Sequence, residues 1–225
     1  MEEASYVVYP HHTAKARAHY VRVVLSKKSG SPVRTVSRAT WSFSRCCPDP
    51  DKTWRSVRLP SPMKTVLIVF HTLTGGTRQM AEAAHRAAAG EPGIEARLLH
   101  AQDAAPDDVL QADGYVFATP ENLAAMAGKM KDFFDRTYYP VLDRVAGRPY
   151  AVLVCAGSDG HNAVRQIERI CTGWRLKRIA EPVIVCTHAQ TPEAILAPKT
   201  IGAADLERCE QVGGALAAGL ALGIY

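Results

Sequence analysis

The chain of 225 residues contains no apolar run approaching the ~20 residues that a membrane helix requires. It has six cysteines but no C-x-x-C pair, so neither a disulfide framework nor a metal site is indicated. Two cysteines, Cys46 and Cys47, are adjacent. The other four fall in apolar strands or on helix faces, which favours buried, reduced thiols in a cytoplasmic protein: Cys155, Cys171, Cys186 and Cys209. The absence of a G-x-S-x-G motif argues against a serine hydrolase of the α/β type.

Basic residues are unevenly distributed. Residues 1–62 hold 11 of the 27 basic and 4 of the 22 acidic side chains, which gives them a net charge of +7 and residues 63–225 a net charge of −2. No helical or strand period persists in residues 1–62, so we expect a basic, disordered extension. Because Met63 directly precedes the first strand, translation from an upstream start is one explanation for this extension. A basic arm is another, although nucleic acid is not an expected partner.

A loop of hydroxyls and glycines follows the apolar run at residues 66–70. The unbroken run is typical of a strand buried on both faces, and helical spacing begins at Arg78. The first turn of such a helix has free N–H groups and a partial positive charge. The loop therefore predicts a phosphate site, although a simple helix cap is an alternative.

Other phosphate-binding motifs are missing. No lysine follows Gly76, as a nucleotide-triphosphate loop requires, and the three glycines of a dinucleotide fingerprint are not present. Ala118 and Thr119 stand where a receiver domain would have an aspartate. The position six residues after Cys155 is His161, which excludes a Cys-x5-Arg phosphatase loop.

The loop Thr72-Leu73-Thr74-Gly75-Gly76-Thr77 resembles the first loop of flavodoxin-like FMN-binding proteins, which has the form Ser/Thr-x-Thr-Gly-Asn-Thr. One position departs from that form, since Gly76 replaces the asparagine. The segment from Thr119 to Thr137 is similar to the second loop of that family and the helix after it, and Cys155 to Gly160 lies where the third loop begins. The resemblance covers residues 63–225.

The resemblance implies FMN as the cofactor and identifies the residues expected to hold it. They are Thr72, Leu73, Thr74, Gly75, Gly76, Thr77, Thr119, Pro120, Glu121, Asn122, Leu123, Ala156, Gly157, Ser158, Asp159 and Gly160. The chemistry would take place on the FMN, so no catalytic side chain is assigned.

Apolar segments alternate with helical ones, which predicts a doubly wound α/β domain over residues 63–225. Residues 94–99 alternate polar with apolar, as an edge strand does, whereas residues 115–118, 151–155 and 183–186 are continuously apolar. We therefore expect a five-stranded parallel sheet in the order 2-1-3-4-5. All three loops would then meet at the switch point of this strand order. Ligands of such sheets generally bind at the switch point, and flavodoxin, which holds FMN there, is a standard example.

Three functions remain open. The first is a reductase that takes hydride from NADPH or NADH and passes electrons to a quinone, a flavin or a similar small acceptor, with homodimerisation implied by similar reductases. The second is an electron-carrier flavodoxin that docks on protein partners, and the third is a flavin-binding regulatory protein. Residues 119–128 and 156–162 contain no aromatic side chain to cover the ring, and this favours the reductase.

Overall fold

The computed structural model describes residues 6–8, 21–23 and 63–225, and the chain divides into two units, Met1–Pro60 and Ser61–Tyr225. In the first unit, strand β1 (Tyr6–Val8) pairs antiparallel with strand β2 (Val21–Val23). The sequence did not predict these two strands. Otherwise, the prediction that residues 1–62 form a disordered extension falls outside the described residues.

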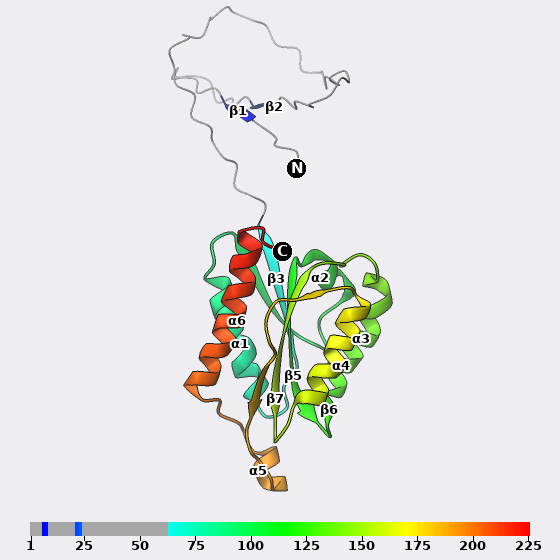
Figure 1. Cartoon of the computed structure of the whole chain (residues 1–225), viewed down its shortest axis with the longest axis vertical. Coiled ribbons are helices and arrows are strands. Elements are labelled where there is room, and N and C mark those ends of the chain that lie inside the picture. Colours follow the sequence, from blue (N-terminus) through cyan, green and yellow to red (C-terminus); the bar gives the residue numbers. More distant parts are fainter. Residues whose placement is uncertain (1–5, 9–20, 24–62) are drawn as a thin grey trace, which may run out of the picture. The chain divides into compact units, whose positions relative to one another are not determined.

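The second unit is built on parallel strands that run side by side (Figure 1). They are β3 (Lys64–Phe70), β4 (Ile94–His100), β5 (Gly114–Asn122), β7 (Pro149–Ala156) and β9 (Val183–Cys186). Their pairing gives the order β4-β3-β5-β7-β9, which is the predicted order 2-1-3-4-5. The residues of β7 are all buried, whereas most of those of β4 are only half-buried, as a central strand and an edge strand should be.

The sheet contains seven strands rather than the five predicted. Strand β6 (Ala125–Met126) turns back along the end of β5, and β8 (Lys177–Arg178) pairs with the start of β7. Tyr150 of β7 pairs with Arg178, and Leu153 of β7 pairs with Val183. The chain advances by three residues in β7 but by five between β8 and β9, so two extra residues interrupt the fifth strand. Pro182 lies in this gap and has no N–H to donate to a neighbouring strand.

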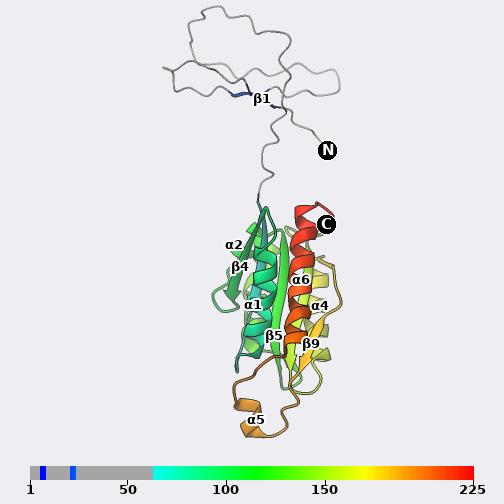
Figure 2. The same cartoon turned by 90° about the vertical axis from the view of Figure 1, so that its left-hand side faces the viewer.

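Helices cover both faces of the sheet. They are α1 (Gly76–Ala89), α2 (Pro106–Gln111), α3 (Gly128–Val141), α4 (His161–Gly173), α5 (Pro192–Leu196) and α6 (Ala203–Ala221). Helices α1 and α6 lie on one face, and α3 and α4 lie on the other (Figures 1 and 2). A Cβ atom on Gly213 would lie 2.1 Å from the carbonyl oxygen of Ala84, so this glycine permits α1 and α6 to approach closely.

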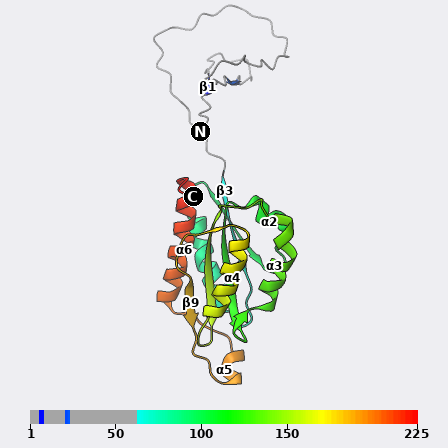
Figure 3. The ribbon, with the colours of Figure 1, turned by 45° about the vertical axis from the view of Figure 1, so that its right-hand side comes forward.

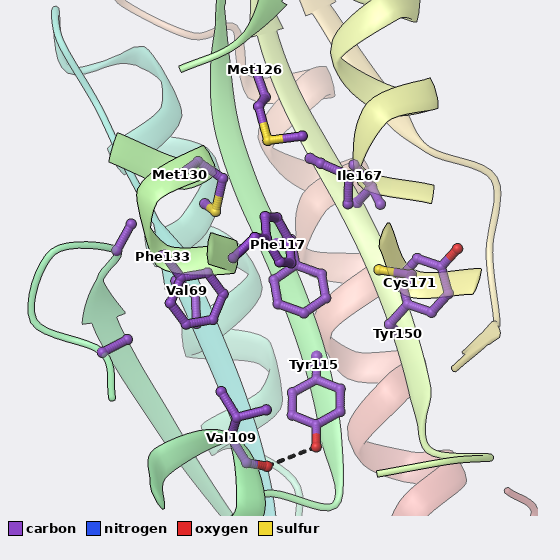
Figure 4. Packing of buried hydrophobic residues seen from close by; sticks show 14 of the residues in the cluster. Val69, Val109, Tyr115, Phe117, Met126, Met130, Phe133, Tyr150, Ile167 and Cys171 are labelled. Carbon is purple, nitrogen blue, oxygen red and sulfur yellow. Dashed lines mark hydrogen bonds between the residues drawn. The ribbon is translucent and has the colours of Figure 1, made fainter. Parts of the chain in front are cut away.

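The sheet separates two apolar cores. In the core beneath α3 and α4, Phe117 packs with its ring centroid 5.1 Å from that of Phe134 and 6.4 Å from that of Trp174. Figure 4 shows Phe117 beside Met130 and Phe133, with the hydroxyl of Tyr115 donating to the carbonyl of Val109 at 2.7 Å. The second core joins α1 and α6 to the other face of the sheet. The apolar faces of the helices thus form both cores together with the sheet.

The cysteines of the second unit are free thiols. Cys155, Cys171 and Cys209 are buried as predicted, whereas Cys186 is partly exposed because it lies at the end of the edge strand β9. No helix among the described residues is both long and apolar enough to cross a membrane.

Candidate functional site

A pocket lies at the carboxyl ends of β3, β5 and β7, where the three predicted loops come together. Its lining consists of Thr72, Leu73, Thr74, Thr77, Pro120, Glu121, Asn122, Cys155, Ala156, Gly157, Thr187, Ala189, Ile195 and Lys199. Nine of the sixteen predicted site residues are therefore in the lining. The rest either shape the loops or lie away from the pocket.

We call residues 72–77 the cradle. Its turn is closed by Thr72, whose Oγ1 accepts a hydrogen bond from the N–H of Gly75 at 3.0 Å. Gly75 has φ +90°, a left-handed conformation that favours glycine, and it directly precedes α1. The Oγ1 of Thr77, in the first turn of α1, is buried and makes no hydrogen bond of normal geometry, although the Cys155 thiol lies close to it. A free hydroxyl at the positive end of a 14-residue helix suits an anionic group.

The structure explains why Gly76 replaces asparagine in the cradle. A Cβ atom at this position would lie 2.7 Å from Sγ of Cys155 and 3.3 Å from Cβ of Lys199. The space that a side chain would need is therefore already filled from β7 and from the segment before α6.

The second predicted loop places three of its five residues in the pocket lining, Pro120, Glu121 and Asn122. Thr119 is fully buried elsewhere: its Oγ1 donates to the carbonyl of Pro120 and accepts from the N–H of Ala127, at 3.0 and 3.2 Å. It thus fixes the turn between β5 and α3. Leu123 has φ +49° and a fully exposed side chain, so it is outside the pocket lining.

Glu121 connects the second loop to the third. Its Oε2 accepts a hydrogen bond from the N–H of Gly160 at 2.7 Å, while its Oε1 is buried and has no partner. Gly160 has φ +90° and directly precedes α4, and a Cβ atom there would lie 2.6 Å from Cγ2 of Ile184. Glu121 therefore holds the third loop with one oxygen and leaves the other free for a donor.

The third predicted loop reaches the pocket only through its first residues. Ala156 and Gly157 line the pocket, whereas Ser158 and Asp159 are exposed and outside its lining. The resemblance of the third loop to that of flavodoxin-like proteins implied that these two polar side chains belong to the site. In the structure they lie on the outer part of the turn that leads to α4.

Sequence reasoning missed one wall of the pocket. We call residues 187–201 the strap; it runs from the end of β9 to α6 and carries α5, which lies beyond the carboxyl edge of the sheet (Figure 3). Thr187, Ala189, Ile195 and Lys199 of the strap line the pocket. One signal was available, because the strap follows the carboxyl end of a parallel strand, as the three predicted loops do.

The strap is fixed to the cradle by backbone and side-chain hydrogen bonds. The N–H of Lys199 donates to the carbonyl of Thr74 at 2.8 Å. The Nε2 of Gln79 donates to the carbonyls of Gly75 and Lys199, and its Oε1 accepts from the N–H of Ile201. A single side chain from α1 thus contacts both the cradle and the strap.

Burial favours the uncharged forms of two titratable groups near the cradle. Burial raises the pKa of the Cys155 thiol, while the charge of Lys199 and the nearby hydroxyl of Thr77 act in the opposite direction. Burial lowers the pKa of His71, and the nearby His100 and Lys129 lower it further. The charges that a ligand would meet in the lining are therefore the carboxylate of Glu121 and the ammonium group of Lys199.

These features define a class of protein: a doubly wound α/β domain with a loop of hydroxyls and glycines at the switch point of its parallel sheet. The sequence profile of a family described as NADPH-dependent FMN reductase matches residues 103–191. A flavodoxin of Aquifex aeolicus is 36% identical over 97 residues, which cover 43% of this chain and 50% of that relative.

A second relative, an NAD(P)H dehydrogenase (quinone) of Acidithiobacillus ferrooxidans, is 33% identical over 33% of this chain and 48% of its own. The chain spans about half the length of the curated relatives it matches. Among solved structures, a flavodoxin from the domain Archaea superposes with a TM-score of 0.57 at 18% identity, over 69% of this chain and 98% of the other. These matches show that residues 63–225 have a flavodoxin-like fold and that part of the chain is similar in sequence to flavodoxin-like proteins.

Proposed function

We propose that the pocket holds FMN and that the protein is an NAD(P)H-dependent reductase of a quinone, a flavin or a similar small acceptor. The observation that carries this proposal is the buried, unpartnered hydroxyl of Thr77 at the start of α1, inside a pocket formed by all three predicted loops. The names of the matched family and of the quinone dehydrogenase relative support the same function.

The residues of the pocket fit the two ends of FMN. The backbone N–H groups at the start of α1 and the hydroxyl of Thr77 would hold the phosphate. Pro120 and Asn122 would contact the ribityl chain and the polar edge of the ring, and the free Oε1 of Glu121 would accept a hydrogen bond from a ring N–H group. When bound, FMN supplies the ability to accept a hydride and pass electrons to an acceptor.

The lining favours a reductase over an electron carrier. No aromatic side chain is among the described residues that line the pocket. A ring bound there would have a face open to a nicotinamide or a quinone. Residues 63–225 also have a net charge of only −2, whereas a carrier that docks on protein partners is expected to have a strongly acidic surface. The flavodoxin relative keeps the electron carrier as a second candidate.

Anaerobic stopped-flow mixing tests the proposal. The flavin bound to the full chain is expected to bleach faster with NADPH or NADH than free FMN does under the same conditions. A flavodoxin-reducing enzyme serves as the comparison donor. If neither nucleotide exceeds the rate for free FMN while that enzyme reduces the bound flavin quickly, the electron carrier replaces the reductase.

We also infer a cytoplasmic protein that acts as a homodimer. Its free cysteines support a reducing compartment. Exposed apolar side chains at the carboxyl edge support a contact between subunits: Leu73, Leu123, Ile195 and Leu196. Light scattering after gel filtration would give the mass of the particle, and a monomer with bound FMN would exclude the dimer.

A further inference from the structure

Lys199 combines three features that the resemblance to flavodoxin-like proteins did not predict. It belongs to the strap, it lines the pocket, and it is the cationic side chain among the described lining residues. Its backbone N–H donates to Thr74 at 2.8 Å, and its Cβ lies against Gly76. Lys199 is therefore fixed at the outer side of the cradle.

The ammonium group of Lys199 stays close to its own strap. Its Nζ donates to the carbonyls of Ala194, Ile195 and Ala197, at 2.6, 2.9 and 2.6 Å. These carbonyls lie at the end of α5, where a positive charge is favourable. The charge nevertheless acts on the cradle side of the pocket, because it lowers the pKa of the buried Cys155 thiol that packs beneath Gly76.

An independent feature points to an anion at the same place. The Oγ1 of Thr77 is buried without a partner, and Thr77 lines the pocket together with Thr72 and Thr74. A phosphate in the cradle would have the first turn of α1 on one side and the strap on the other. The strap would then contribute a full charge where the helix contributes only about half of one.

We propose that Lys199 is a specificity-determining residue that makes the pocket prefer a phosphorylated flavin, FMN, over its unphosphorylated counterpart, riboflavin. The inference rests on the proposed binding of FMN. The ammonium group supplies a charge-assisted interaction to the phosphate and none to the terminal hydroxyl of riboflavin. With no phosphate in the cradle, the carbonyls of α5 satisfy its donors.

Two substitutions separate this role from a purely structural one. Lys199→Met keeps most of the aliphatic side chain and removes the charge, and Lys199→Arg keeps the charge. Dissociation constants of FMN and riboflavin are measured on the full-length apoprotein by quenching of flavin fluorescence. Lys199→Met is expected to weaken FMN by about ten- to a hundredfold and riboflavin by less than about twofold. Lys199→Arg is expected to restore most of the preference.

Lys177→Met is the matched control, because Lys177 is an exposed lysine of β8, beside the start of β7 and away from the pocket at the carboxyl ends of the strands. It should leave the ratio of the two dissociation constants unchanged. Added salt should lower the preference of the wild-type protein for FMN, measured as the dissociation constant of riboflavin divided by that of FMN. The same salt should lower the preference of Lys199→Met by less. Thermal unfolding of each variant shows whether the strap substitution has damaged the fold.

Each outcome of these binding measurements either supports or contradicts the proposed role of Lys199. Equal losses of FMN and riboflavin in Lys199→Met would mean that the side chain only holds α5, and unchanged FMN affinity would mean that its charge does not reach the phosphate. Either result overturns the role of Lys199. A wild-type protein that binds neither flavin would instead overturn the proposed function, so the two failures are distinguishable.

Discussion

At the residue scale, Thr77 has a property that the fold alone does not explain. Its hydroxyl is buried without a partner, and an unpaired buried hydroxyl costs about 1–3 kcal/mol of folding free energy. A ligand oxygen at the start of α1 would remove that cost. The side chain is thus suited to binding rather than to the stability of the protein without ligand.

Thr77→Ala is expected to weaken FMN about ten- to a hundredfold and to leave the melting temperature unchanged or slightly raised. Thr77→Ser, which keeps the hydroxyl, is the control and should bind FMN within a few-fold of the wild type. Titration of apoprotein with FMN gives both values. An alanine variant with wild-type affinity would remove the cradle from the site.

The sequence predicted the residues of the site unevenly. Hydroxyls and glycines between a buried strand and a helix have a specific physical meaning, so the cradle was recognisable. The direction of a single side chain in a turn has no such signal, and Thr119, Leu123 and Asp159 all lie away from the pocket lining. Lys199 was missed because its contact with Thr74 joins distant parts of the chain.

At the element scale, the close packing between the cradle and β7 depends on the absence of a side chain at Gly76. Gly76 does not have a positive φ, so replacing it by alanine is opposed by contact with Cys155 and Lys199 rather than by the backbone. Extra atoms in a well-packed site typically cost 1–3 kcal/mol.

Gly76→Ala is therefore expected to lower the free energy of unfolding by about 1–3 kcal/mol. Adding Cys155→Ala should recover part of this loss, because it removes the sulfur that lies 2.7 Å from the new Cβ. Gly214→Ala is the control: its Cβ would lie 3.8 Å from that of Ala87 in α1, an ordinary contact, and the substitution should stabilise the protein by about 0.4–1 kcal/mol. Denaturant unfolding is measured for the wild type, Gly76→Ala, Cys155→Ala, the double variant and the control, and additive effects of the first two substitutions would refute the contact.

The elements themselves were easier to predict than their irregularities. Continuous and alternating apolar patterns were sufficient to order β4, β3, β5, β7 and β9. The interruption between β8 and β9 depends on their register against β7. The apolar pattern of one strand carries no information about its register against another. The strap is also irregular over most of its length, and periodicity gives no information about such a segment.

At the scale of the whole molecule, the described cores belong to the second unit. Both are made from residues between Val66 and Leu220. Deletion of residues 1–62 is therefore expected to leave the melting temperature and the flavin content unchanged within error. Differential scanning fluorimetry and flavin absorbance would measure these two quantities.

The same deletion removes most of the basic charge, since the remaining residues have a net charge of −2. Retention on heparin should consequently fall. An insoluble truncated protein, or one that loses its flavin, would show that the N-terminal segment contributes to the fold of residues 63–225.

The position of Gln79 has a consequence for how the pocket opens. Because this one side chain bonds to both Lys199 and Ile201, the strap cannot separate from α1 without breaking these two bonds together. The amide protons of Lys199 and Ile201 should then exchange with deuterium in a single opening event, at a common rate. Gln79→Ala should accelerate both exchanges, and a bound ligand should slow both by the same factor.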